Sequence, residues 1–142
     1  MTLKSSRNLL TLIWVVGFLP PFFILAARTY FGSYYGDNDK EAWSWFTPNI
    51  VPTLGVIIGT LASSAVGKQT EEKTVDSFFF KLTVALSILY LTVFNLIFIL
   101  EPLSDSPPLE TLKRSSLFLG IAQGLVTSAL GAFFVRSAGA EN

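Results

Sequence analysis

The stretch of sequence that decides the fold runs from Phe78 to Leu100 and reads FFFKLTVALSILYLTVFNLIFIL. Lys81, near its start, is the only charged residue within it. A helix needs roughly 20 apolar residues to cross the hydrocarbon core of a bilayer, and this run is long enough. Lipid offers the backbone no hydrogen-bond partner, so only helices and closed barrels span it, and alternating strand patterns are missing here. The stretch therefore predicts a transmembrane helix.

Three further apolar runs of spanning length surround this one. They cover about 9–27, 48–67 and 116–135, and with 78–100 they make four predicted spans. Only short polar segments lie between them in the 142 residues. The sequence therefore predicts one transmembrane domain over 1–142, an all-α integral membrane four-helix bundle with short loops, set in a lipid bilayer.

Composition excludes several classes of function. Charged residues make up 14% of the chain, against about 25% in a typical soluble domain, and the mean hydropathy is +0.54. Histidine and cysteine are absent, which excludes His or Cys metal sites, thiol nucleophiles and disulfides. The net charge is zero and there is no basic tract, so nothing favours nucleic acid. We expect no enzyme activity, no cofactor, no metal and no nucleic-acid partner.

The first run resembles a signal peptide in outline, because Lys4 and Arg7 precede an apolar stretch that ends at Leu25-Ala26-Ala27. A usual signal core has about 7–15 apolar residues, and this stretch is longer. We therefore expect it to remain as a span.

Lys and Arg placement predicts the orientation, since cytoplasmic loops carry the excess of these residues. With the N-terminus inside, the inner side holds six cations, Lys4, Arg7, Lys68, Lys73, Lys81 and Arg136. The outer side then holds four, Arg28, Lys40, Lys113 and Arg114. Both termini are predicted to be cytoplasmic, and the membrane is predicted to be the bacterial inner (plasma) membrane.

The segment 28–47, predicted to lie outside, is rich in aromatic residues. Trp and Tyr favour the headgroup level of a bilayer, so Tyr34, Tyr35, Trp43 and Trp45 are interpreted as an interfacial belt, with a short helix over 40–46 lying on the membrane. A docking surface for a protein partner is the alternative for this segment. The inner loop 68–77 is interpreted as a plain connector, with a contact for a cytoplasmic partner as its alternative.

Small residues recur every fourth position in two of the spans. We call these the small-residue stripes: Gly55, Gly59, Ser63 and Gly67 in one span, and Gly120, Gly124, Ser128 and Ala132 in the other. Residues four apart share a helix face, and small residues let two membrane helices approach closely. The stripes predict packing of the two spans against each other within one bundle, pairing between copies in a homo-oligomer, or both.

The two stripes also match at an offset of 65 residues. Both spans run from outside to inside in the predicted topology. The match suggests two helical hairpins related by an axis along the membrane normal, although convergent helix packing explains it equally well.

Prolines and amides are the other notable residues inside the spans. Pro20 and Pro21 lie near the middle of the first span and predict a kink, or a hinge that opens a pore or cleft. Asn95 and Gln123 fall in the outer halves of their spans and predict either interhelical hydrogen bonding or pore lining. No Asp, Glu or Arg lies at mid-membrane, which argues against a proton-coupled pump.

Two segments carry a resemblance to a known family: WSWFTPNIVPTL at 43–54, ahead of the second span, and LGIAQGL at 119–125 with GAFF at 131–134. In length, span count and general character the chain resembles small bacterial four-helix membrane proteins of phage-exclusion and conflict systems, the RexB-like exclusion proteins. The resemblance implies an ion-conducting or membrane-depolarising effector that a partner switches. No catalytic motif accompanies it.

These observations lead to one functional prediction and one alternative. The prediction is a self-associating, channel-like or membrane-perturbing effector in bacterial antiphage defence. The alternative is a structural or accessory subunit that anchors or stabilises a larger membrane complex.

Overall fold

The computed structural model describes residues 3–32, 34–66 and 76–138. Four long helices dominate these ranges, α1 (Leu3–Tyr30), α2 (Asp39–Val66), α3 (Ser77–Leu100) and α4 (Pro108–Ala138). Two short 3-10 helices, η1 (Gly36–Asn38) and η2 (Glu101–Leu103), precede α2 and α4. Each long helix is long and apolar enough to cross a membrane. The all-α prediction and the four candidate spans are confirmed, which indicates a membrane protein.

The helices extend beyond the predicted spans. The segment 40–46, predicted as a separate surface helix, is instead the start of α2, so that prediction is wrong. Pro48 and Pro52 therefore lie inside α2 and not in its first turn. Helix α4 begins directly at Pro108, since a proline in the first turn has no intrahelical donor to lose. The Asp76 carboxylate starts α3 by accepting a hydrogen bond from the backbone N–H of Phe79 at 2.8 Å.

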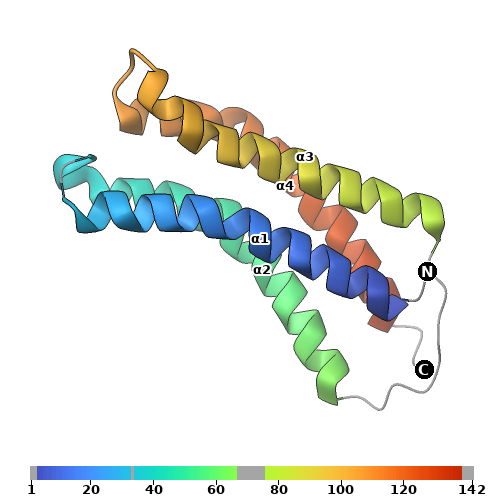
Figure 1. Cartoon of the computed structure of the whole chain (residues 1–142). Helices are drawn as coiled ribbons and strands as arrows, with labels where there is room; N and C mark the ends of the chain where they lie inside the picture. Colours follow the sequence, from blue (N-terminus) through green and yellow to red (C-terminus); the bar gives the residue numbers. More distant parts are fainter. Residues whose placement is uncertain (1–2, 33, 67–75, 139–142) are drawn as a thin grey trace.

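Parallel helices lie side by side in the bundle. The most extensive contacts join the parallel pairs α2 with α4 and α1 with α3, and the antiparallel pair α3 with α4 (Figure 1). An axis along the membrane normal would place α1 and α3 on opposite sides of the bundle, and likewise α2 and α4. The contacts observed are instead those of two hairpins stacked laterally, so they do not support the predicted repeat axis.

Aromatic rings fill the centre of the bundle. Trp45 stacks on Phe94, with ring centroids 5.5 Å apart and planes within 2° of parallel. Trp14 stacks on Tyr90 with centroids 5.8 Å apart and planes inclined by 26°. Phe46 of α2 contacts Phe94 of α3, so these large rings join α1, α2 and α3 across the interior. Each such ring buries a large apolar area and leaves little space between the helices.

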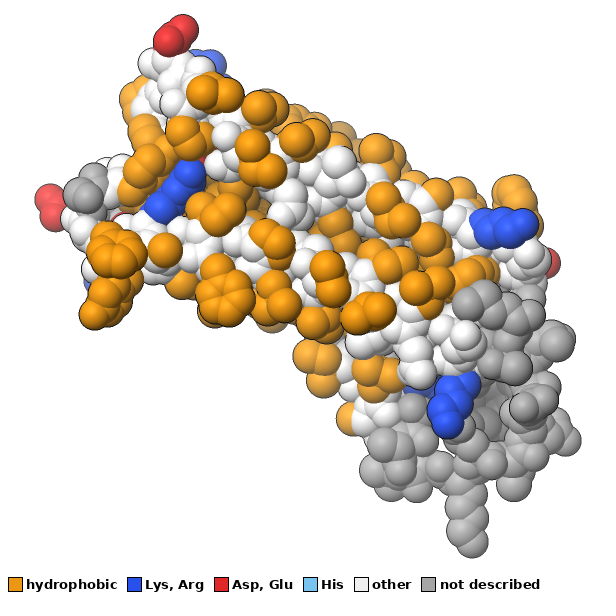
Figure 2. All heavy atoms as spheres, viewed as in Figure 1, with side chains coloured by type: hydrophobic (Ala, Val, Ile, Leu, Met, Phe, Trp, Pro, Cys, Tyr) orange, Lys and Arg blue, Asp and Glu red, His pale blue; other side chains and the backbone are white. Residues whose placement is uncertain are grey.

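The outside of the bundle is apolar as well. Figure 2 shows one face on which hydrophobic side chains extend along most of the molecule, while Lys and Arg side chains lie toward its ends. Large exposed hydrophobic side chains occur on every long helix, among them Leu12, Phe23, Ile58, Leu89, Leu117 and Ile121. A soluble monomer rarely exposes so extensive an apolar surface. A lipid environment accounts for it.

Candidate functional site

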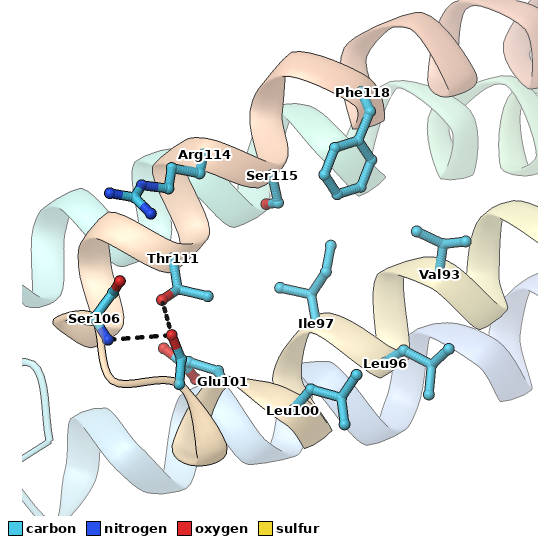
Figure 3. A pocket seen from close by; sticks show the side chains of 11 residues that line it. Val93, Leu96, Ile97, Leu100, Glu101, Ser106, Thr111, Arg114, Ser115 and Phe118 are labelled. Atoms are coloured by element: carbon cyan, nitrogen blue, oxygen red, sulfur yellow. Dashed lines mark hydrogen bonds between the residues drawn. The ribbon is translucent and has the colours of Figure 1, made fainter.

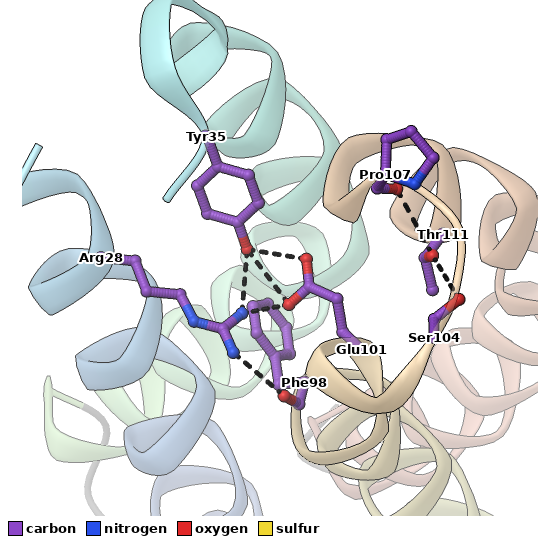
Figure 4. Close-up of polar contacts among 7 residues, drawn as sticks. All are labelled: Arg28, Tyr35, Phe98, Glu101, Ser104, Pro107 and Thr111. Atoms are coloured by element: carbon purple, nitrogen blue, oxygen red, sulfur yellow. Dashed lines mark hydrogen bonds and ion pairs between the residues drawn. The ribbon is translucent and has the colours of Figure 1, made fainter. Parts of the chain in front are cut away.

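A buried polar cluster lies at the end of the bundle where α1 and α3 finish (Figure 4). The Arg28 guanidinium forms an ion pair with the Glu101 carboxylate, and its Nη2 donates to the carbonyl oxygen of Phe98 at 3.3 Å. The Tyr35 hydroxyl donates to Glu101 Oε1 at 3.2 Å and accepts from Arg28 Nη1 at 3.1 Å. The cluster therefore fastens α1, the segment before η1 and the start of η2 to one another.

The cluster is shielded from its surroundings. The Glu101 side chain is fully buried and that of Arg28 is 14% exposed. The Arg28 guanidinium also lies 4.1 Å from the centre of the Tyr34 ring, in cation–π contact. Burial raises the pKa of the Tyr35 phenol, so this group keeps its proton and can donate it in a hydrogen bond. Charges removed from water need this full set of partners.

Sequence reasoning missed this cluster because Arg28 and Glu101 are separated by 73 residues. Arg28 directly follows the first predicted span, and Glu101 directly follows the third. Their opposite charges at the same predicted membrane face were the one available signal, and nothing local indicates that the first and third helices touch there.

The interfacial-belt interpretation does not hold for two of its four rings. Trp45 is 6% exposed and Tyr35 is 5% exposed, so both rings belong to the core and the interpretation is wrong for them. Tyr34 and Trp43 are half-buried. The Trp43 Nε1 donates to the Thr29 hydroxyl at 3.0 Å, which ties α2 to the end of α1.

The two intramembrane amides each satisfy a carbonyl oxygen that a proline has deprived of its helical partner. Pro21 has no N–H to donate to the carbonyl oxygen of Gly17, four residues earlier. The Asn95 Nδ2 on α3 donates to that oxygen instead, at 2.9 Å. Helix α1 continues through Pro20 and Pro21 without interruption, and the α3 amide supports it where its own ladder is broken.

The same arrangement occurs between α2 and α4. Pro52 cannot donate to the carbonyl oxygen of Pro48, and the Gln123 Nε2 donates to that oxygen at 2.5 Å. Asn95 and Gln123 therefore form interhelical hydrogen bonds, as one of the two interpretations predicts. They bond to the backbones of α1 and α2 and not to each other.

The described glycines of the small-residue stripes face away from the bundle. A Cβ atom added at Gly55, Gly59, Gly120 or Gly124 would meet nothing within 4 Å. Ser128 and Ala132 are exposed too, while Gly67 and the side chain of Ser63 lie outside the described part of the chain. Packing of these glycines within one bundle is therefore contradicted.

Helices α2 and α4 nevertheless pack against each other through other residues. The hydroxyl groups of Thr53 and Thr127 lie 3.0 Å apart, and Ile57, Leu119 and Val126 are buried. Among the described glycines, Gly17 is the one that a close neighbour requires to lack a side chain, and the sequence patterns did not single it out. A Cβ at Gly17 on α1 would lie 2.6 Å from Leu91 Cδ1 on α3.

Two further predictions concern the inner loop 68–77 and metal binding. Residues 67–75, which contain most of the inner loop 68–77, lie outside the described ranges. Among the residues that the structure describes, no three acidic, His or Cys side chains gather where they could hold a metal ion.

The described residues define a class of protein: they form an all-helical bundle with four helices long and apolar enough to cross a membrane, tied together by amide and ionic contacts. No known protein family, no curated protein and no solved structure matches the chain.

Proposed function

We propose that this is a non-enzymatic membrane protein that self-associates through the small-residue stripes of α2 and α4. One observation carries the proposal: a Cβ atom at any described glycine of the two stripes would stand in open space, with nothing within 4 Å at Gly55, Gly59, Gly120 or Gly124. Glycine costs helix propensity, and in lipid its benefit is the close approach of a second helix. Since that helix does not come from the same bundle, a second copy is the proposed source.

The proposed action is that of a channel-like or membrane-perturbing effector, with antiphage defence as the predicted setting. Rings such as Trp14, Trp45 and Phe94 occupy the interior of one bundle. A conducting path would therefore form between copies, where the small residues meet. This makes conduction dependent on assembly.

The test of self-association replaces small residues on each stripe by a bulky one. Gly59→Leu with Gly124→Leu would keep two helices apart, so we expect the detergent-purified oligomer to become a monomer in light scattering and cross-linking. Ala85→Leu is the matched control, because Ala85 is a small exposed residue on α3 outside both stripes. An oligomer unchanged by the double substitution would disprove the assignment of this face.

The test of conduction uses the same variants in liposomes loaded with a fluorescent ion reporter. We expect the natural chain and the Ala85→Leu control to release ions, and the double variant to release far less. Equal release by the monomeric variant would contradict a path formed between copies.

The aromatic-filled interior also favours the second candidate, a structural or accessory subunit of a larger membrane complex. In that case the exposed stripes would receive helices of another protein. Purification from the native membrane would give a foreign partner in fixed ratio, and liposomes would show no release.

A further inference from the structure

A groove between α3 and α4 opens on the outer surface of the bundle, at the same end as the Arg28–Glu101 pair. Its volume is about 450 Å³, within the usual size range of small-molecule sites. The last two turns of α3 form one wall, and η2, the following loop and the first turns of α4 form the other (Figure 3). Both helices are candidate membrane spans, so an occupant can arrive sideways from the bilayer.

The groove changes character along its length. Val93, Ile97 and Phe118 line one end, and this part of the wall carries no charge. Hydroxyl and charged side chains line the other end, where Ser106, Thr111 and Arg114 lie. Ser104 is hydrogen-bonded to Ser106 and Thr111 and lines the same end. An amphiphile with a chain at one end and a polar head at the other fits such a division.

The polar end offers hydroxyl groups that are held in place. The Ser104 Oγ accepts hydrogen bonds from the Ser106 backbone N–H at 3.2 Å and from the Thr111 hydroxyl at 3.3 Å. The Ser115 hydroxyl donates to the carbonyl oxygen of Leu112 at 2.6 Å. The Thr111 bond ties the loop after η2 to the start of α4, and the other two bonds lie within the loop and within α4.

Charge at this end favours a phosphate. The Arg114 guanidinium is 68% exposed and pairs with Glu110, one turn earlier, at 2.6 Å. An exposed pair of this kind is weak, so the guanidinium is free to turn to a phosphodiester, which accepts two parallel hydrogen bonds. The Glu101 carboxylate also lines the groove, but Arg28 and Tyr35 already compensate its charge. Exposed Asp105, between the two serines, does not line the groove.

We propose that this groove binds one phospholipid of the surrounding bilayer, with an acyl chain along Val93, Ile97 and Phe118 and its phosphate on Arg114. The site requires only that α3 and α4 lie in lipid, and it does not depend on self-association. Binding would seal the gap between the two helices at the membrane surface.

The experiment measures lipid retained by the full chain in native mass spectrometry after extraction from nanodiscs that contain phosphatidylglycerol. Arg114→Gln should lower retention about tenfold, the effect of one charged hydrogen-bond pair. The matched control is Lys113→Gln, which removes a neighbouring cation that pairs with Glu41 and does not line the groove. Equal loss in both variants would overturn the site, because it would mean general attraction to a charged surface.

A second pair of variants tests the apolar end without changing charge. Leu96 lines the groove, whereas Leu89 is exposed on the same helix outside it. We expect Leu96→Trp to abolish retention and Leu89→Trp to preserve it. Retention that survives Leu96→Trp would overturn the proposal, and Leu89→Trp controls for general damage to α3.

Two probes separate the parts of the ligand. Glycerol 3-phosphate has the phosphate without a chain, and diacylglycerol has the chains without a phosphate. Neither alone should displace phosphatidylglycerol. Displacement by glycerol 3-phosphate would overturn the proposal, because the groove would then bind phosphate without an acyl chain. Displacement by diacylglycerol would overturn it as well, because binding would then not need the phosphate or Arg114.

Discussion

Glycine has opposite consequences at different positions of this chain. At Gly17 the missing side chain admits Leu91 from the neighbouring helix, and the same backbone position presents its carbonyl oxygen to Asn95. At Gly120 the missing side chain meets no neighbour within the bundle. The value of a glycine is therefore set by what lies opposite it.

Gly17→Val should destabilise the bundle by about 1–3 kcal/mol, because the added atoms overlap Leu91 in a packed interface. Gly131→Val on α4 is the control, since it carries the same change in helix propensity at a position with open space outside both stripes. The free energy of unfolding in mixed micelles measures both. Equal losses would mean that α1 and α3 do not approach closely at Gly17.

The ion pair at the end of the bundle is asymmetric, because Glu101 is fully buried and Arg28 is partly exposed. Removing Arg28 leaves a buried carboxylate without its cation, so Arg28→Met should cost about 3–5 kcal/mol. Arg114→Met, in the exposed pair with Glu110, should cost less than about 1 kcal/mol. Thermal unfolding in detergent compares the two, and similar values would contradict the burial of Glu101.

At the scale of elements, each pair of parallel helices is joined by an amide that replaces a missing proline donor. Asn95 joins α3 to α1 at the carbonyl oxygen four residues before Pro21, and Gln123 joins α4 to α2 at the carbonyl oxygen four residues before Pro52. A proline can stay inside a membrane helix where a neighbouring helix satisfies the freed carbonyl oxygen. The proline on one helix and the amide on its neighbour therefore act as one structural unit.

A double-mutant cycle tests this unit. Asn95→Leu should cost about 0.6–1.7 kcal/mol in the natural chain, the range for interhelical hydrogen bonds in membranes. The cost should fall in a Pro21→Ala background, because the restored N–H can bond to the Gly17 carbonyl oxygen. An unchanged cost would show that the proline and the amide act independently. Gln123→Leu with Pro52→Ala repeats the test on the other pair.

At the scale of the whole molecule, four helices of spanning length place successive loops on alternating sides. The chain has no cysteine, so single cysteines report their own positions. Asp37 and Asp105 are exposed at one end of the bundle, and Lys4 and Ser77 are exposed at the other. The predicted orientation puts the first pair outside the cell.

An impermeant maleimide added to intact cells should label Asp37→Cys and Asp105→Cys, and should label Lys4→Cys and Ser77→Cys only after permeabilisation. The opposite pattern would reverse the orientation while keeping four spans. Labelling of Asp37→Cys and Ser77→Cys from the same side would contradict the four-span topology.

The sequence by itself determined the four helices, because crossing lipid depends on apolarity summed over about 20 consecutive residues and needs no tertiary partner. It also singled out Asn95 and Gln123, since a polar amide inside an apolar run is visible locally. Only the tertiary structure decided which carbonyl oxygens accept from these amides. It also decided the pairing of Arg28 with Glu101 and the outward direction of the glycine stripes. Each depends on which helix lies opposite, and residues about 70 or more positions apart determine that.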